Sequence, residues 1–197
     1  MKKTMMAVVL GVLWSSAAFA GDLTLQGGYQ SFQNENYSDA EQVVARYEMP
    51  IAGELSWAVE GSYHGKSDHH GLGWLNGYGG GADLIFRPVV SDRFKPYVLG
   101  GVGWYWWNFR ESSEVQDRLI TIDTGDALGY KLAAGFDIPL NERWDLNFEV
   151  GYFQSDVPVD AVDHTTNTKS SGLGGDTVGQ EEVNVMVGLK YKTDFLL

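Results

Sequence analysis

The sequence predicts an all-β protein: an eight-stranded antiparallel up-and-down transmembrane β-barrel preceded by a cleaved signal peptide. Three observations support this prediction. They are an apolar amino-terminal segment, side chains that alternate between apolar and polar, and connections that alternate between short and long. The 197 residues include 25 Gly, 7 Trp, 10 Tyr and 9 Phe, which is a composition too aromatic for a disordered chain.

The first twenty residues are typical of a secretory signal peptide. Lys2 and Lys3 precede an apolar run from Met5 to Leu13, and Ala18-Phe19-Ala20 forms a small-residue cleavage signature. The apolar run is short for a membrane-spanning helix, which needs about 20 residues. We therefore expect cleavage after Ala20, so that residues 1–20 form the signal peptide and residues 21–197 form one barrel domain.

The first four strands are expected at residues 22–32, 41–49, 54–64 and 77–87. Successive strand side chains point to opposite faces, so a period of two indicates a strand with one apolar and one polar face. The alternation is weak in the first two segments and clear in the third and fourth. Glycines at 77, 79, 80, 81, 100, 101 and 103 are expected to relieve crowding around the fourth and fifth strands.

The last four strands are expected at residues 95–107, 127–138, 143–154 and 181–195. Residues 95–107 are apolar on both faces, so their orientation stays open, whereas the other three segments alternate throughout. From residue 144 to residue 153 the apolar face is Trp144, Leu146, Phe148, Val150 and Tyr152, and the polar face is Asp145, Asn147, Glu149 and Gly151.

The connections between the expected strands differ in length. Residues 50–53, 88–94 and 139–143 form short turns, and the longer polar connections are 33–40, 65–76, 108–126 and 155–180. Short turns at one end and long loops at the other are typical of bacterial outer-membrane barrels. We expect the Gly-, Asp- and Thr-rich 155–180 segment to be a mobile loop, and we expect the protein in the outer membrane of a Gram-negative cell.

The alternation alone does not fix which face points inward. A lipocalin-type soluble barrel is apolar inside and polar outside, and a membrane barrel is the reverse. The signal peptide and the unequal connections favour the membrane barrel. Its expected inward acids are Glu48, Glu54, Glu60, Asp83, Asp137, Asp145, Glu149 and Glu182, and its expected inward bases are Arg46, Arg87, Lys131, Lys190 and Lys192.

Charges of both signs inside a narrow barrel predict a salt-bridged plug, because a buried charge must be paired or hydrated. The candidate functional site is therefore a lumen charge network. Its predicted members are Arg46, Glu48, Glu60, Asp83, Arg87, Lys131, Asp137, Glu149 and Lys190.

Other candidate sites are weaker. His64, Asp68, His69 and His70 could hold Zn²⁺ or Cu²⁺, and Asp123, Asp126, Asp160, Asp163 and Asp176 could hold Ca²⁺, but solvated loops explain both sets. Glu60, Ser62 and His64 could imitate a Ser-His-acid hydrolase, although polar lumen filling explains them as well. The Gly172–Gly179 stretch lacks the Lys-Ser/Thr pair of a phosphate loop. Trp104, Trp106 and Trp107 are interpreted as an interfacial girdle.

Three segments resemble a known family. The run from Lys95 to Tyr105, KPYVLGGVGWY, looks like a strand common in small outer-membrane β-barrels of the OmpW and opacity/OmpA-like type. The run from Ala134 to Trp144 is similar to the next hairpin of that group, and Gly188-Leu189-Lys190-Tyr191 is similar to its carboxy-terminal assembly signal. The chain ends Phe195-Leu196-Leu197, whereas such chains usually end on an aromatic residue. The resemblance implies the barrel architecture and recognition by the barrel-insertion machinery.

Composition excludes several functions. With no Cys the chain has no disulfide and no thiolate site, and 26 acidic against 14 basic residues argue against a nucleic-acid partner. We expect a structural or surface-interaction protein without catalysis, cofactor or metal, whose partners are outer-membrane lipids and lipopolysaccharide. The alternatives are a narrow channel for small apolar or zwitterionic solutes and, third, a lipid-modifying outer-membrane enzyme.

Overall fold

The computed structural model describes residues 21–33, 38–68, 73–88, 91–112, 120–163, 168–171 and 178–193. The predicted signal peptide at residues 1–20 and the terminal Phe195-Leu196-Leu197 lie outside the described residues. No helix in the described part of the chain is long and apolar enough to cross a membrane.

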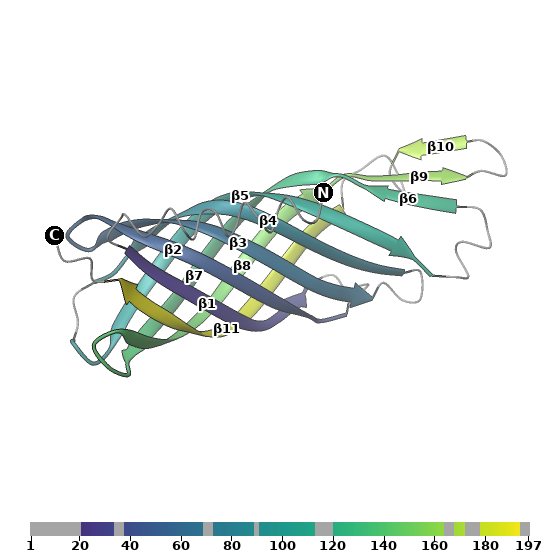
Figure 1. The fold of residues 1–197 in the computed structure, drawn as a ribbon. Helices are drawn as coiled ribbons and strands as arrows, with labels where there is room; N and C mark the ends of the chain where they lie inside the picture. Colours follow the sequence, from purple (N-terminus) through teal and green to yellow (C-terminus); the bar gives the residue numbers. More distant parts are fainter. Residues whose placement is uncertain are drawn as a thin grey trace.

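Eight strands close into a barrel (Figure 1). Around the wall their order is β1-β11-β8-β7-β5-β4-β3-β2, and each strand pairs antiparallel with both neighbours. This confirms the predicted fold. The strands are β1 (Gly21–Phe32), β2 (Ala40–Ala52), β3 (Leu55–Asp68), β4 (Gly73–Phe86), β5 (Lys95–Glu111), β7 (Asp126–Pro139), β8 (Trp144–Val157) and β11 (Val178–Thr193).

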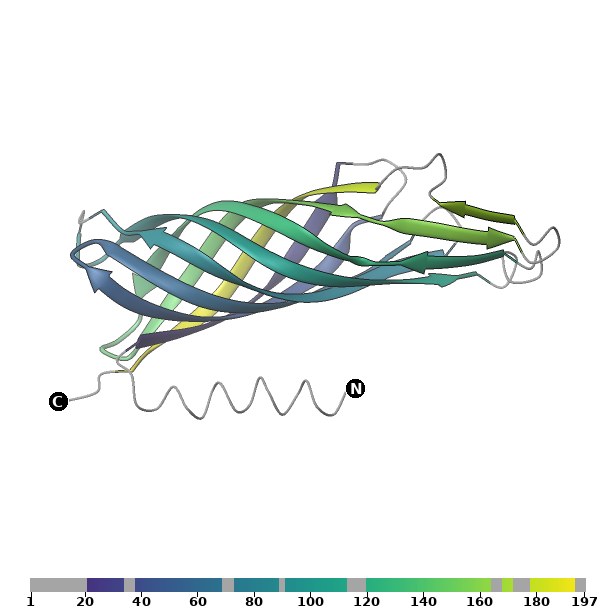
Figure 2. The same ribbon diagram turned by 90° about the horizontal axis from the view of Figure 1, so that it is seen from above.

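Three further strands extend the wall beyond one end of the barrel (Figures 1 and 2). They are β6 (Ile120–Thr124), β9 (Val159–Asp163) and β10 (Thr168–Ser171), in the order β10-β9-β6. The prediction that residues 155–180 form one loop is therefore wrong. The predicted end of the fifth strand at residue 107 is also wrong, because β5 continues to Glu111. The pairing of β7 with β8 resumes beyond a short break as β6 with β9, and the Gly125 amide donates to the Pro158 carbonyl across that break at 2.9 Å.

The two ends of the barrel differ. At one end, here called the turn end, β2–β3, β4–β5 and β7–β8 are joined by the predicted short connections, and both β1 and β11 reach it with Gly21 and Thr193. Glu54 belongs to the β2–β3 turn and is exposed, so its predicted inward position is wrong. The opposite end, called the loop end, carries the β6–β9–β10 extension (Figure 2).

The sense of the alternation is that of a membrane barrel. Outward apolar side chains such as Leu132, Val150 and Val185 are exposed, whereas Arg46 and Asp137 are buried inside. A lipocalin-type interior is thereby excluded, because the lumen holds the charges and the outer wall holds the aliphatic side chains.

Strand β5 resolves the orientation that the sequence left open. Tyr97, Leu99, Tyr105 and Trp107 are buried inside the barrel, and Trp104 and Trp106 alternate with them on the outside. Trp104 and Trp106 are thus placed as a girdle requires, but Trp107 is not. Its indole lies over Gly77, where an added Cβ would stand 2.6 Å from the ring.

Phe148 tests the outward face, because it lies midway between the outward aromatic residues Trp144 and Tyr152 of β8 and stacks on Phe136 at 5.1 Å. Phe148→Arg would place a guanidinium near the middle of the lipid-facing band, and we expect a loss of about 2–4 kcal/mol in unfolding free energy. Urea unfolding in lipid vesicles measures it. Leu140→Arg, in the exposed β7–β8 turn, is the control, and equal losses for both variants would contradict the assigned face.

Candidate functional site

The nine side chains predicted for the lumen network all point into the barrel, where they form two layers. One layer, called the Arg46 layer, consists of Arg46, Glu60, Asp83, Lys131 and Glu149. The other, called the Arg87 layer, is nearer the turn end and consists of Glu48, Arg87, Asp137 and Lys190.

Arg46 on β2 contacts three carboxylates on three other strands. Its Nη2 donates to Glu60 Oε2 on β3 at 2.8 Å, and its Nη1 donates to Glu149 Oε2 on β8 at 2.7 Å. A second contact, from Nη2 to Glu149 Oε1 at 3.0 Å, makes that pair bidentate, which is the strong geometry for a guanidinium. Arg46 Nε also lies 3.2 Å from Asp83 Oδ2 on β4.

The register of the strands explains why these groups meet. Arg46 and Glu60 are direct partners across β2 and β3, so they share a face and a level. Asp83 and Lys131 are both register partners of Gly101, one on each side of β5. A Cβ on Gly101 would stand 2.0 Å from Asp83 Oδ1, so only glycine leaves the path between the two charges open.

Lys131 belongs to the Arg46 layer, and Tyr97 on β5 hydrogen-bonds to that layer. Lys131 Nζ bonds to Glu60 and lies 3.4 Å from Asp83 Oδ2. The Tyr97 hydroxyl donates to Glu149 Oε2 at 2.8 Å and accepts from Asn147 Nδ2 at 3.0 Å. With Tyr97, the layer therefore ties β2, β3, β4, β5, β7 and β8 together through side chains alone.

The Arg87 layer is balanced in charge. Arg87, just after β4, forms a bidentate pair with Glu48 on β2 at 2.8 and 2.7 Å and donates to Asp137 on β7 at 2.8 Å. Lys190 on β11 lies 2.9 Å from Glu48 and also 2.9 Å from Asp22 on β1. The side chain of Asp22 was not among the predicted inward acids, because the alternation of residues 22–32 is weak.

A polar cavity of about 300 Å³ opens between the Arg87 layer and the turn end. Besides that layer it is lined by Asp22, Lys95, Asp145 and Lys192, so its charges are mixed as well. Lys192 Nζ lies 2.8 Å from Asp145 Oδ1. The lumen thus has a charged vestibule at this end, and the vestibule stops at the Arg87 layer.

The half of the lumen nearer the loop end is organised around His64. Its Nδ1 lies 2.9 Å from Gln30 Oε1 and 3.4 Å from Glu182 Oε2, and its Nε2 lies 3.3 Å from Ser62 Oγ. The predicted trio of Glu60, Ser62 and His64 is therefore corrected: Glu182 takes the place of Glu60, whose carboxylate bonds to Arg46 and Lys131.

Aromatic rings enclose this histidine. The rings of Trp107, Phe153 and Tyr105 lie 5.1, 5.5 and 5.7 Å from the imidazole, and all three are buried. With Leu75, Ala127 and Val157 they form an apolar cluster across the loop-end half of the lumen. His64 is thereby packed beneath hydrophobic side chains, and Ser62 beside it is buried as well.

The metal candidates receive no support within the described residues. There, no three His, Asp or Glu side chains gather as metal ligands would. His69, His70 and Asp176 lie outside the described residues, as does most of Gly172–Gly179. Asp68 ends β3, and its amide bonds to the Ser38 hydroxyl at 2.8 Å.

Comparison with known proteins identifies the family. The sequence model of a protein family, the outer membrane protein beta-barrel domain, matches residues 5–192 of the chain. The chain belongs to this family. An outer-membrane location follows for this barrel, and the turn end is accordingly its periplasmic end.

Solved structures of other outer-membrane barrels have the same fold. Neisserial surface protein A has a TM-score of 0.61 at 13% identity, over 88% of this chain and 97% of that chain. A major outer membrane protein from Thermus thermophilus has a TM-score of 0.60 at 13% identity, over 88% and 100%. The N-terminal β-barrel domain of Pseudomonas aeruginosa OprF has a TM-score of 0.55 at 10% identity, over 88% and 99%. Among curated protein sequences, none matches this chain.

The role of Arg46 in the layer can be tested by replacing it with an uncharged side chain, because Glu60, Asp83 and Glu149 then lose the cation that they share. We expect Arg46→Met to reduce the unfolding free energy by about 3–5 kcal/mol, as for breaking a buried ion pair. Lys95→Met is the control: Lys95 is 40% exposed and 3.8 Å from Asp145, so its loss should cost about 1 kcal/mol or less. Urea unfolding in lipid vesicles measures both, and similar losses would contradict the role of the layer.

Proposed function

We propose that this outer-membrane barrel is a closed, non-catalytic protein with a structural or surface-interaction role. The observation that supports this most directly is the set of ion pairs that cross the lumen. Arg46 and Glu149 stand on strands β2 and β8, three places apart around the wall, and Lys131 on β7 reaches Glu60 on β3 across the same number of places.

These ion pairs span the lumen from one side of the barrel to the other, whereas contacts between adjacent strands run along the wall. We call such a cross-lumen ion pair a chord. An eight-stranded barrel has an interior that its own side chains fill. Chords at two successive layers therefore leave solutes no straight path, and the apolar cluster around Trp107 and Phe153 adds a third obstruction toward the loop end.

The loop end supplies the surface for interaction in this proposal. There the β10-β9-β6 sheet continues the wall outward beyond the barrel (Figure 2). Such a projecting sheet suits contact with other molecules outside the cell, while the barrel serves as its anchor.

Conductance measurements in planar bilayers distinguish the closed barrel from the channel alternative. We expect the purified protein to give no steady single-channel steps. The double variant Arg46→Ser/Glu149→Ser removes this chord in a charge-neutral way, and it should conduct more than the parent. Reproducible steps from the parent that shift on Lys131→Ala would contradict the proposal and favour a narrow channel.

One observation favours catalysis instead, and a separate experiment tests it. Ser62, His64 and Glu182 are ordered as a hydrolase needs, with contacts of 3.3 and 3.4 Å. Because Ser62 and His64 are both buried and aromatic rings surround His64, we expect a fluorophosphonate probe to leave the folded barrel unlabelled. Labelling that disappears in both Ser62→Ala and His64→Gln would replace the non-catalytic proposal with an enzyme.

A further inference from the structure

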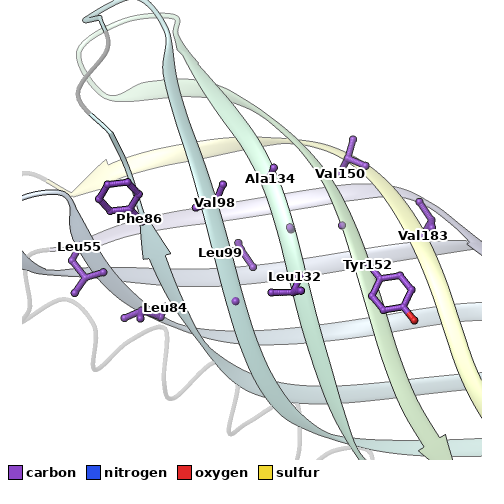
Figure 3. A pocket seen from close by; sticks show the side chains of 13 residues that line it. Leu55, Leu84, Phe86, Val98, Leu99, Leu132, Ala134, Val150, Tyr152 and Val183 are labelled. Carbon is purple, nitrogen blue, oxygen red and sulfur yellow. The ribbon is translucent and has the colours of Figure 1, made fainter.

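The hollows of this barrel differ in what lines them. A groove of about 600 Å³ on the outer wall is lined by apolar side chains such as Leu84, Val98 and Leu132 (Figure 3). It faces lipid, as the outer wall of any membrane barrel does, so it indicates no particular ligand. The vestibule of about 300 Å³ at the turn end is different, because charged side chains line it and it opens toward the periplasm.

Two lysines share one carboxylate on one side of the vestibule. Asp145 on β8 lies between Lys192 on β11 and Lys95 on β5. Lys192 Nζ is 2.8 Å from Asp145 Oδ1, and Lys95 Nζ is 3.8 Å from Asp145 Oδ2. Strand β7 separates β5 from β8 and places uncharged Pro139 opposite Asp145. This side of the vestibule therefore has one more cation than it has acids.

The other acids of the vestibule are held by the Arg87 layer. One of them, Asp137, is the register partner of Lys95, but its carboxylate accepts a hydrogen bond from Arg87 Nη1 at 2.8 Å. Asp22 lies 2.9 Å from a cation of the same layer. Among the described residues, Lys95 Nζ thus has no hydrogen-bond acceptor, and Asp145 supplies the nearest carboxylate oxygen.

The accessible charges of the vestibule are mainly positive. Three of its four cations have partly exposed side chains, at 40% for Lys95, 20% for Arg87 and 19% for Lys192. Three of its four acids are at most 5% exposed, namely Glu48, Asp137 and Asp145. Asp22, at 32%, is the exception among the acids. A ligand that enters from the periplasm therefore meets cations first, with most of the carboxylates behind them.

Unused hydrogen-bond donors indicate the chemistry of the ligand. A guanidinium has five N–H donors, and Arg87 uses three of them on Glu48 and Asp137. The ammonium of Lys95 has three donors and no acceptor in the described part of the chain. Such groups bond most strongly to phosphate and carboxylate oxygens. The volume of about 300 Å³ is at the lower end of the range for small-molecule sites.

We propose that the vestibule binds a small oxyanion of the periplasm, a phosphate or carboxylate group held by Lys95 and Lys192 with Arg87 at the inner end. The turn end faces the periplasm because the short turns of such barrels are periplasmic. The site lies on the periplasmic side of the Arg87 layer, so it does not depend on whether the lumen is closed. If residues 1–20 are removed as predicted, the ammonium of Gly21, which also lines the cavity, adds positive charge there.

Titration of the ¹⁵N-labelled barrel in detergent micelles with inorganic phosphate, at an ionic strength held constant with sodium chloride, tests the site by NMR. We expect saturable shifts of the amide resonances of the lining residues, with a dissociation constant of about 1–10 mM. Acetate, titrated in the same way, shows whether a carboxylate binds better than a phosphate. Absence of saturable shifts with both probes, or shifts confined to the loop end, would overturn the proposal.

Lys95→Gln tests the residues, because it removes one lysine while Lys192 stays 2.8 Å from Asp145. We expect it to raise the dissociation constant of phosphate about tenfold or more, and Lys95→Arg, which keeps the charge, to restore most of the affinity. Arg93→Gln is the matched control, since it removes one positive charge from the same β4–β5 connection at an exposed position outside the cavity. An unchanged constant in Lys95→Gln, or equal weakening by Lys95→Gln and Arg93→Gln, in variants folded by heat-modifiability, would overturn the proposal.

Discussion

The guanidinium of Arg46 is the constraint on which the interior depends. It is buried, permanently charged and held by carboxylates from β3, β4 and β8. A charge in this position is tolerated only with partners in good geometry, since an unpaired buried ion is costly. Its planar fork therefore fixes the relative positions of four strands, and those strands include both sides of the barrel.

Much of the surrounding sequence follows from making room for these charges. Gly101 lets Asp83 and Lys131 approach each other. Because side chains alternate along a strand, each inward charge also determines which neighbours face lipid. Lys131 inside places Tyr130 and Leu132 outside, where both are exposed, so the polar interior and the apolar exterior are specified together. This coupling makes a register slip unfavourable on both faces at once.

The sequence predicts the strands well where one face is polar and the other apolar. Residues 144–153 are the clearest case, and β8 has the predicted face inward. Residues 95–107 are apolar on both faces, so periodicity could not orient them, and the girdle assignment of Trp107 was wrong for that reason. The β9 and β10 strands were missed because they lie within the 155–180 segment, whose overall Gly, Asp and Thr content resembles a loop. They form where the pairing of β7 and β8 continues outward.

Pairing between side chains was harder to predict than their orientation. Eight of the nine network residues lie at inward positions of barrel strands, as does Glu182, and the ninth, Arg87, directly follows β4. Which cation pairs with which carboxylate, however, depends on how the strands are tilted and staggered in the barrel. The contact of His64 with Glu182 joins β3 to β11, and no spacing in the chain indicates it. Asn147, which links Gln26, Tyr97 and Asp137, was likewise recognisable as inward but not as a junction.

A double-mutant cycle between Arg46 and Glu149 tests the central claim most directly. The unfolding free energies of the parent, Arg46→Met, Glu149→Gln and the double variant would be measured in lipid vesicles. If the chord across the lumen holds the barrel together, the two changes are strongly non-additive, with a coupling energy of about 2 kcal/mol or more. Additivity within about 0.5 kcal/mol would contradict the account, because it would mean that the two walls are held together by the backbone ladder alone.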